Sequence, residues 1–387
     1  MRMGLGALTA SSFVLSLGGA VAQAIPGGAQ LADLTALDPA TAVGSEDGKW
    51  LYYDIRALGI EGQGWTDLAH PYDRLPAKAE GVVRDPVWGL SHNSAGMCVR
   101  FVTDARSIAA RWKLRSASLD MDHMPATGVS GLDLYGRGDD GWHWVGTGRP
   151  GGVDNEEVLV EGLDEGPREF ILYLPLYNGV ESVSVGVPPG TTLAKAPAYP
   201  NDHAKPICFY GTSITQGGCA SRTGMAYAAI IGRWLDRPAI NLGFSGNGQM
   251  EPEMARLLAE LDVSCYVIDC CPNLGPELVA ERTEPLVRTI REARPEVPIV
   301  LVENIIYQQA PLVAWARDAG AAKNVELKAA YDRLIADGVA GLHYVEGADL
   351  LGGDGLGTVD GTHPTDLGFL RMAEVLTPVL ARVLNGE

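Results

Sequence analysis

Four short segments, far apart in the chain, carry residue types that together could hydrolyse an ester. Acyl transfer from an ester needs a nucleophile, a base, a group that orients the base, and hydrogen-bond donors for the oxyanion. In chain order the candidates are Ser213, Gly246, Asn273, and Asp360 with His363. Each segment supplies one of these parts, and each falls where a strand is expected to end. The combination predicts a serine-esterase site.

The candidate nucleophile, Ser213, follows an apolar run at 206–210 that is typical of a buried strand. Its hydroxyl is therefore expected at the carboxyl edge of a sheet, where Gly211 lets the backbone turn and a helix can begin. The N-terminus of that helix would favour the negative charge that develops during attack. Taken alone, the same segment also fits an ordinary strand-to-helix turn with a capping serine.

The candidate base is His363, which follows Asp360 by three residues on a turn that contains a glycine. Among the seven histidines, only His363 follows an acid at this spacing on the expected edge. It would take the proton from Ser213, while Asp360 would hold its tautomer and stabilise the imidazolium. The backbone N–H groups of Ser213 and Gly246 and the side-chain amide of Asn273 would form the oxyanion hole.

The elements that must position these residues form an alternating pattern beyond residue 206. The expected strands cover 206–210, 239–242, 265–270, 299–302 and 342–345, and the expected helices cover 225–235, 252–261, 276–293, 325–336 and 364–384. Continuous apolar strands separated by amphipathic helices imply a parallel sheet covered on both faces. In such a sheet, ligands bind beyond the carboxyl ends of the strands.

The first half of the chain shows a different pattern. Short stretches between 47 and 187, such as 108–114, alternate apolar and polar residues, which is typical of half-buried strands in a sandwich or jelly roll. Five prolines then interrupt the stretch from 188 to 206. We therefore expect an all-β sandwich module at 45–190, a linker at 191–205 and the α/β domain at 206–387.

The N-terminus is typical of a secretory signal. Arg2 precedes an apolar run, and Ala22-Gln23-Ala24 fits the small-x-small cleavage pattern, so residues 1–24 are expected to be removed near Ala24. A retained N-terminal anchor is the alternative. No later segment approaches the apolar length of a membrane span. The mature protein is expected to be periplasmic or secreted.

Composition narrows the possible partners and cofactors. The net charge is −18, and no cluster of lysines and arginines stands out, which argues against a nucleic-acid partner. The chain has no CxxC or HExxH pattern, so no metal is expected. The six cysteines are even in number and could pair, but several lie in apolar strand-like runs. We expect mostly reduced, buried thiols.

The order Ser213, Gly246, Asn273 and His363 resembles the four sequence blocks of the SGNH (GDSL-type) hydrolases, from Pro206 to the C-terminus. The resemblance implies a flavodoxin-like α/β/α sandwich and serine-dependent ester hydrolysis without a cofactor.

Two departures from the family pattern bear on the site. Thr212 stands where the family commonly has an aspartate, and the third block reads Cys-Pro-Asn273-Leu in place of Gly-x-Asn-Asp. Asn304, at the end of the following strand, therefore competes with Asn273 as the side-chain donor.

A second resemblance lies in the β module, where Gly131-Leu-Asp133-Leu-Tyr135 is similar to the GxDLY motif found before some SGNH hydrolases. Such pairs resemble bacterial carbohydrate-active esterases that remove acetyl groups from polysaccharides. Asp133 and Tyr135 themselves are expected to make structural hydrogen bonds within a strand pair.

These patterns together predict an exported serine esterase that acts on a small ester or an acetylated oligo- or polysaccharide. A lipase, thioesterase or lysophospholipase is the enzymatic alternative. A polysaccharide-binding protein, in which the α/β domain is only a scaffold, is the non-enzymatic one.

Overall fold

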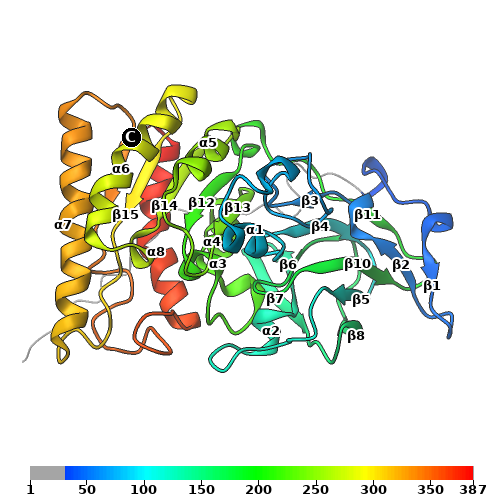
Figure 1. Ribbon diagram of the computed structural model, residues 1–387. Coiled ribbons are helices and arrows are strands. Elements are labelled where there is room, and N and C mark those ends of the chain that lie inside the picture. The colour runs from blue at the N-terminus through cyan, green and yellow to red at the C-terminus, as the bar shows by residue number, and fades with distance from the viewer. Residues whose placement is uncertain (1–30, 387) are drawn as a thin grey trace, which may run out of the picture.

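A computed structural model describes residues 31–386 of the chain (Figure 1). The described residues form two antiparallel sheets in the first half and one parallel sheet in the second. The predicted signal segment, 1–24, lies outside the described residues. None of the helices in 31–386 has an apolar stretch long enough to cross a lipid bilayer.

The two antiparallel sheets pack face to face as a β-sandwich. One has the strand order β1-β2-β10-β5-β8, and the other has the order β11-β4-β9-β6-β7 with β3 beside β4. The strands are β1 (Val43–Gly44), β2 (Leu51–Asp54), β3 (Ile60–Glu61), β4 (Cys98–Thr103), β5 (Ser107–Leu114), β6 (Leu132–Gly138), β7 (Gly141–Gly148), β8 (Asp154–Glu161), β9 (Arg168–Tyr173), β10 (Val180–Val187) and β11 (Leu193–Lys195).

The core of this sandwich follows the alternation seen in the sequence. Along β5, Ile108, Ala110, Trp112 and Leu114 are buried in one apolar cluster with residues of the facing sheet. Side chains at every second position of a strand share a face, so a period of two places them together. The apolar cluster between the sheets makes this half a sandwich rather than an open sheet.

The predicted linker at 191–205 is partly wrong. Its residues Leu193–Lys195 form β11, which pairs with β4 at the edge of a sandwich sheet. The prolines of this region lie on either side of that run, so Leu193, Ala194 and Lys195 keep the backbone N–H groups that pairing needs. Leu193 and Ala194 are buried, which gives the short strand an apolar anchor.

The parallel sheet has the strand order β13-β12-β14-β15-β16, which is the flavodoxin-like order 2-1-3-4-5. Its strands are β12 (Ile207–Gly211), β13 (Ala239–Gly243), β14 (Cys265–Asp269), β15 (Ile299–Val302) and β16 (Leu342–Val345). Because β12 lies between β13 and β14, the loops that follow those two strands flank the carboxyl end of β12.

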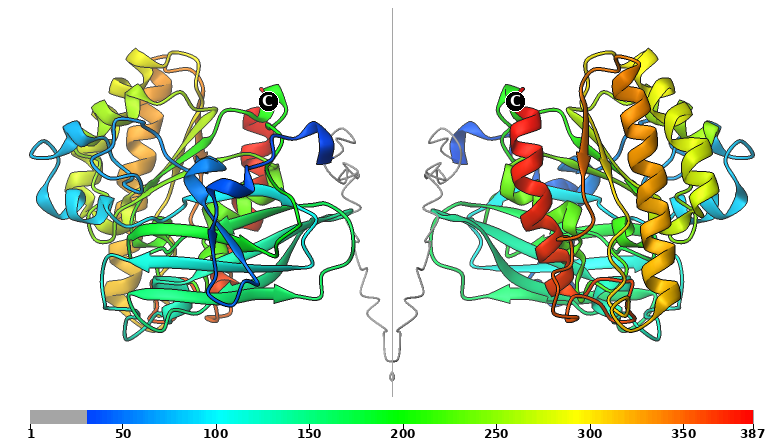
Figure 2. Two further views of the ribbon diagram at one scale, coloured as in Figure 1. Left: turned by 90° about the vertical axis from the view of Figure 1, so that its right-hand side faces the viewer. Right: turned by 90° about the vertical axis from the view of Figure 1, so that its left-hand side faces the viewer.

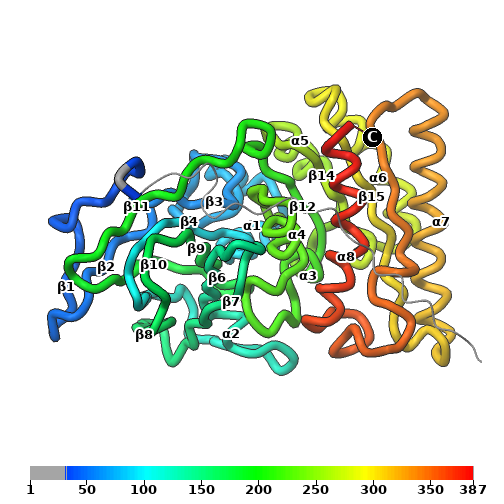
Figure 3. Tube along the Cα trace, turned by 180° about the vertical axis from the view of Figure 1, so that it is seen from behind, coloured from blue at the N-terminus to red at the C-terminus, as the bar shows by residue number. Residues whose placement is uncertain are grey.

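Helices cover both faces of this sheet, as the pattern of apolar strands predicted. The longer helices are α4 (Tyr227–Leu235), α5 (Pro252–Glu260), α6 (Pro276–Ala293), α7 (Ala314–Ala336) and α8 (Asp366–Leu384). One apolar cluster joins the sheet to α5, α6 and α7, and a second joins it to α4 and α8. Figure 3, seen from behind, shows α8 crossing in front of the sheet.

A segment of the first half packs into the core of the second. Leu75, Ala79, Val83 and Val87 belong to the same apolar cluster as Tyr210 of β12 and residues of α5. This segment, drawn in blue, lies beside the yellow-green helices in Figure 2. It includes the short helix α1 (Asp85–Ser91). The apolar core of the α/β half therefore includes residues from the first half of the chain.

Candidate active site

Ser213 is the first residue of the short helix α3 (Ser213–Gln216), directly after β12. A side chain at Gly211 would place its Cβ only 2.0 Å from Thr215 Oγ1, so only glycine allows this sharp turn. Thr212 caps the helix: its Oγ1 accepts from the Ile214 N–H, and its own N–H donates to Thr215 Oγ1. The turn holds Ser213 at the carboxyl edge of the sheet, with 7% of its surface exposed.

The structure brings the three predicted triad residues into one hydrogen-bonded row. Ser213 Oγ lies 2.9 Å from His363 Nε2, and His363 Nδ1 lies 2.7 Å from Asp360 Oδ2. The loop before α8 fixes this arrangement locally, because Asp360 Oδ1 also accepts from the backbone N–H groups of Thr362 and His363 at 2.9 and 2.8 Å. Gly361, with φ +89°, supplies the left-handed turn between them.

The hydrogen bonds around Asp360 decide its charge. Partial burial acts to raise the pKa of Asp360, but the N–H groups of His363 and Thr362 and the imidazole outweigh burial and hold the pKa below its ordinary value. The carboxylate is therefore ionised at neutral pH and accepts the Nδ1 proton of His363. This tautomer leaves Nε2 free to accept a proton from Ser213.

The predicted oxyanion donors come from the loops on either side of β12. Gly246 has φ +69°, and within residues 31–386 its N–H and that of Ser213 donate no hydrogen bond. Asn273 follows β14, and its side-chain amide donates to the Phe244 carbonyl at 3.2 Å, which links the two loops. An amide carries two N–H bonds, so this contact leaves Asn273 a second donor.

Asn304, the competing donor, has a different environment. It is fully buried, and its amide donates to the Ile305 carbonyl while its Oδ1 accepts from the Tyr307 hydroxyl. Its backbone N–H donates to Asn324. Asn304 holds the loop after β15 together and has no surface that a bound ester could reach.

The β-sandwich contributes a contact to Ser213 that sequence patterns missed. The Tyr177 hydroxyl, from the loop between β9 and β10, donates to the Ser213 carbonyl at 3.1 Å. The Gly218 N–H donates to the same carbonyl at 2.7 Å. The receiving group is a backbone carbonyl, which every residue has, so no signal in the sequence could have identified this partner.

Arg74 was missed for a similar reason. It is fully buried, yet it faces no carboxylate: its Nη1 donates to the carbonyls of Asn241 and Gly243 at the end of β13, at 3.2 and 2.6 Å. Its other nitrogens donate to the carbonyls of Leu90 and Asn93. Burial lowers the pKa of Arg74 to about 9, so the guanidinium is still charged at neutral pH. It ties the loop that contains Gly246 to the first half of the chain.

A buried acid lies beneath α3. Asp269, the last residue of β14, accepts from the hydroxyls of Thr215 and Tyr227 at 3.2 and 3.1 Å through Oδ2. Its Oδ1 has no hydrogen-bond partner. Burial raises the pKa of Asp269 to about 7, although the two hydroxyls act to lower it. Asp269 therefore changes its charge near neutral pH, one hydrogen bond away from α3.

The motif residue Asp133 makes the expected bonds within its strand pair and further bonds across the domain boundary. Its Oδ1 accepts from Trp144 and Thr147 of β7 at 3.0 and 3.2 Å. Its Oδ2 accepts from the Arg222 guanidinium at 2.8 Å and from the Gly224 N–H at 2.9 Å. Both of these partners lie in the stretch between α3 and α4. The expectation of a purely local role for this residue was therefore incomplete.

The other motif residue, Tyr135, lies at the same boundary. Its hydroxyl accepts from the Arg222 guanidinium, and the guanidinium of Arg233 lies over its ring at 3.9 Å from the centroid. Asp133 and Tyr135 together clamp the sandwich to the segment between α3 and α4.

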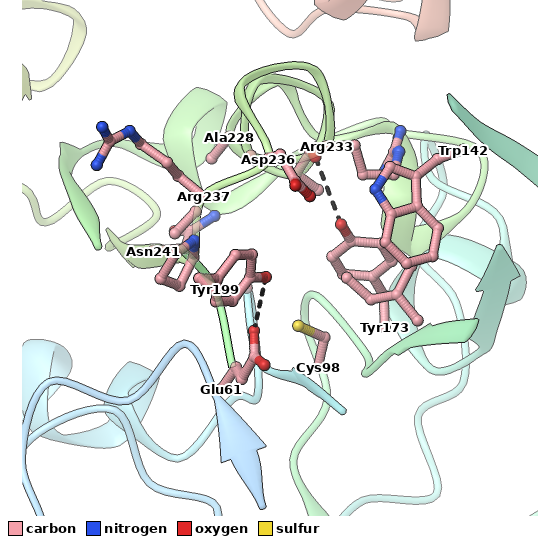
Figure 4. Close-up of a pocket in the computed structure, with 16 residues that line it drawn as sticks. Glu61, Cys98, Trp142, Tyr173, Tyr199, Ala228, Arg233, Asp236, Arg237 and Asn241 are labelled. Carbon is pink, nitrogen blue, oxygen red and sulfur yellow. Dashed lines mark hydrogen bonds between the residues drawn. The ribbon is translucent and has the colours of Figure 1, made fainter. Parts of the chain in front are cut away.

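A small cavity lies at the same boundary. Figure 4 shows it with Tyr199 and Asn241 on one side, Tyr173 and Arg233 on the other, and Cys98 between them. Its free volume is about 20 Å³, which is far too small for a sugar ring or an acyl chain. None of the predicted site residues lines it, so it has no part in binding an ester.

The six cysteines, all within the described residues, are buried and unpaired. Burial raises the thiol pKa of Cys271 to about 12, and it raises those of Cys208 and Cys265 as well. These thiols are neutral in the folded protein and act as small apolar groups.

Comparison with known proteins identifies both halves. Residues 204–381 match the model of the GDSL-like lipase/acylhydrolase family, and residues 50–193 match that of the GxDLY domain, the N-terminus of SGNH-hydrolase-type esterases. No curated protein matches the sequence significantly.

Solved structures match over both halves of the chain. A candidate GDSL-like lipase from Bacteroides ovatus is 34% identical, with 87% of this chain and 98% of that one covered and a TM-score of 0.82. The salicylyl-acyltransferase SsfX3 of a tetracycline biosynthetic pathway is 20% identical, with 88% and 97% covered and a TM-score of 0.67. A family two carbohydrate esterase from Clostridium thermocellum, in complex with cellohexaose, is 18% identical, with 75% and 93% covered and a TM-score of 0.55. The last two likenesses concern the fold.

Proposed function

Given that this chain is an ester hydrolase of the GDSL-like lipase/acylhydrolase family, we propose that Ser213 is its nucleophile, His363 its base and Asp360 the residue that orients the base. The observation that carries this proposal is the row of two hydrogen bonds, 2.9 Å from Ser213 Oγ to His363 Nε2 and 2.7 Å from Nδ1 to Asp360. The row has the geometry that proton transfer during attack requires.

The proposed reaction has two steps. His363 Nε2 takes the Ser213 proton as Oγ attacks the ester carbonyl, and the imidazolium then protonates the leaving alcohol, which gives an acyl-serine. Water, deprotonated by the same nitrogen, then attacks the acyl carbon, and the imidazolium returns that proton to Ser213 Oγ as the acid leaves. In each step the negative oxygen is stabilised by the N–H groups of Ser213 and Gly246 and by the Asn273 amide.

The Ser213→Ala variant tests the nucleophile. It should release no acid from p-nitrophenyl acetate above the rate of a buffer blank, because within residues 31–386 no other hydroxyl is paired with His363 Nε2. Ser182→Ala removes an exposed hydroxyl from β10 and should leave turnover unchanged. Circular dichroism should show the same fold in both variants. Full activity in Ser213→Ala would exclude this serine as the nucleophile.

For the substrate, we propose an acetylated carbohydrate. The support is the fold, shared over both halves of the chain with a carbohydrate esterase that was solved with a cello-oligosaccharide. Acetate released from a panel of acetylated plant and microbial glycans would measure this directly. Rates with p-nitrophenyl acetate, butyrate and octanoate separate the alternatives: a strong preference for octanoate would favour a lipase-type enzyme and contradict deacetylation.

We also propose that the protein is exported, on the strength of the N-terminal sequence. The mature chain, isolated from the periplasm or the medium of the native cells, should begin near Ile25. An intact N-terminus in the cytosolic fraction would contradict export.

A further inference from the structure

Two histidines and a cysteine from three separate segments meet beside Ser213. His123 lies in the segment between β5 and β6 of the sandwich, Cys219 follows α3, and His363 precedes α8. Their ligand atoms all lie within 4.8 Å of one another. The rings of His123 and His363 meet edge to face, with centroids 5.6 Å apart. The three residues are far apart in the sequence, so no local motif announces the cluster.

The donor set of this cluster suits one class of ion. A thiolate and two imidazoles are ligands that Zn²⁺ prefers, and three protein ligands with an open fourth position are common in zinc sites. Zinc bonds of about 2.0–2.3 Å place tetrahedral donor atoms roughly 3.3–3.6 Å apart. The three ligand atoms, which lie within 4.8 Å of one another, would have to approach by up to about 1 Å to reach this spacing. His123 is exposed, so a change in its side-chain torsions can supply this movement.

The surroundings also favour a cation. His363 donates Nδ1–H to the Asp360 carboxylate, and a carboxylate behind a ligating imidazole is the usual support of a zinc ligand. Cys219, the third proposed ligand, is buried beside this hydrogen-bonded pair. An ion that binds here must displace the thiol proton to solvent, and its positive charge offsets the cost of the buried thiolate.

Cys219 also has an unusual backbone. Its φ is +76°, a left-handed conformation that residues with a side chain rarely adopt. Backbone strain of this kind persists where the surrounding structure imposes it, and it clusters at functional sites. The left-handed residue here is Cys219, whose sulfur lies within 4.8 Å of a His363 ring nitrogen.

We propose that His123, Cys219 and His363 bind a zinc ion, and that the bound ion stops ester hydrolysis. Nε2 of His363 has one lone pair, which either accepts the Ser213 proton or binds the metal. The inhibition, unlike the binding, rests on the proposed role of His363 as the base. The sandwich, through His123, would then take part in controlling the site on the α/β domain.

Binding can be measured without catalysis in the Ser213→Ala variant, which keeps all three ligands. Titration with Co²⁺ as a spectroscopic probe should give one equivalent and a thiolate-to-cobalt charge-transfer band. Zn²⁺ should displace the Co²⁺ and remove the band. The band should be absent when Cys219→Ser is added and unchanged when Cys98→Ser, a buried cysteine elsewhere, is added instead. A missing band, or one that survives Cys219→Ser, would overturn the site.

Inhibition is then measured with the wild-type esterase. Zn²⁺ should inhibit turnover of p-nitrophenyl acetate, Mg²⁺ should not, and a chelator should restore the rate. His123→Ala and Cys219→Ser should each need at least about tenfold more Zn²⁺ for half inhibition, whereas His143→Ala, an exposed histidine elsewhere, should match the wild type. Equal inhibition of all variants would overturn the proposal. Stoichiometric binding without inhibition would leave the metal site standing and contradict the role of His363 as base.

Discussion

Asn273 and Asn304 are both candidates for the side-chain donor of the proposed oxyanion hole, and their hydrogen-bond partners distinguish them. Asn273 bridges the loops beside β12, whereas Asn304 is buried and bonded within its own loop. Asn273→Ala should therefore lower kcat on the order of 100- to 1,000-fold, the usual loss of one oxyanion donor. Asn304→Ala should lower Tm but leave kcat of the folded enzyme within about threefold. The reverse pattern in steady-state kinetics would reassign the donor.

The buried acid beneath α3 predicts a pH-dependent stability. The pKa of Asp269 rises from its ordinary value of 3.8 to about 7 in the folded protein, so the folded state holds an extra proton between these values. Its contribution to stability is full in acid and is lost as pH rises through about 7; a shift of this size corresponds to about 4 kcal/mol. Asp269→Asn keeps the acceptor for both hydroxyls and removes the titration.

The measurement is the Tm of both proteins at pH 5 and pH 8. The variant should gain several degrees relative to the wild type on going from pH 5 to pH 8, since roughly 2 °C accompanies each kcal/mol in a chain of this size. Asp262→Asn, at an exposed aspartate, should show no such change. A difference between variant and wild type that is independent of pH would contradict the raised pKa.

The sequence indicated the residues whose side-chain types suit ester hydrolysis. It did not indicate the residues that bind backbone carbonyls. Ser213, Asp360 and His363 could be placed at one edge because few side chains do their chemistry and each lies beside a strand end or a helix start. Tyr177 and Arg74 could not, because they bind backbone carbonyls that any residue supplies.

Among the elements, the β6–β7 hairpin carries the strongest link between the halves. Asp133 is fully buried and its carboxylate faces Arg222, so Asp133→Ala leaves the Gly224 N–H without its acceptor and the Arg222 guanidinium without its carboxylate. Removing one partner of a fully buried ion pair costs about 3–5 kcal/mol, and the 24% exposure of the Arg222 side chain puts the expected loss below that range. We expect a large fall in Tm and a lower kcat, because the stretch after α3 loses its anchor.

The same hairpin supplies a control for that variant. Asp140 is exposed at its tip, where it pairs with His143, so Asp140→Ala should leave the Tm close to that of the wild type. Thermal melting of the three proteins checks this. Equal stability of Asp133→Ala and the wild type would show that the clamp contributes nothing.

Helices and strands were predictable where one face is buried and the apolar residues of that face recur at a regular spacing. The helix expected at 276–293 has these bounds in the structure, and β5 follows its alternation. The first part of α7 was missed because 314–324 consists mainly of small and polar residues with no apolar stripe. The edge strand β8 was missed because its run Asp-Asn-Glu-Glu is as polar as a loop.

For the whole molecule, the shared core predicts that the α/β half depends on the sandwich. The first half supplies Leu75, Val83 and Val87 to the core beneath α5, and Arg74 to the end of β13. A chain that begins at residue 204 should therefore be insoluble or expose apolar surface, and should have less than about one hundredth of the activity of the full chain. Soluble yield, dye binding and esterase rate measure this. A stable, fully active fragment would contradict the shared core.

The sheet types of both halves followed from the sequence, because parallel and antiparallel sheets leave different apolar patterns. The shared core did not. Leu75, Val83 and Val87 lie in a stretch of turns and short helices that Pro76 and Pro86 interrupt, so the spacing of its apolar residues did not indicate which sheet they would cover.

The clamp at Asp133 has a consequence for how such chains can be recombined. One carboxylate serves the sandwich through one oxygen and the hydrolase through the other, so a graft that replaces either half leaves the other with an unmatched charge. A working chimera would need Asp133 in its sandwich and Arg222 in its hydrolase half, even when the two halves come from different proteins. The sandwich and the hydrolase domain would therefore be exchanged between proteins most readily as one unit.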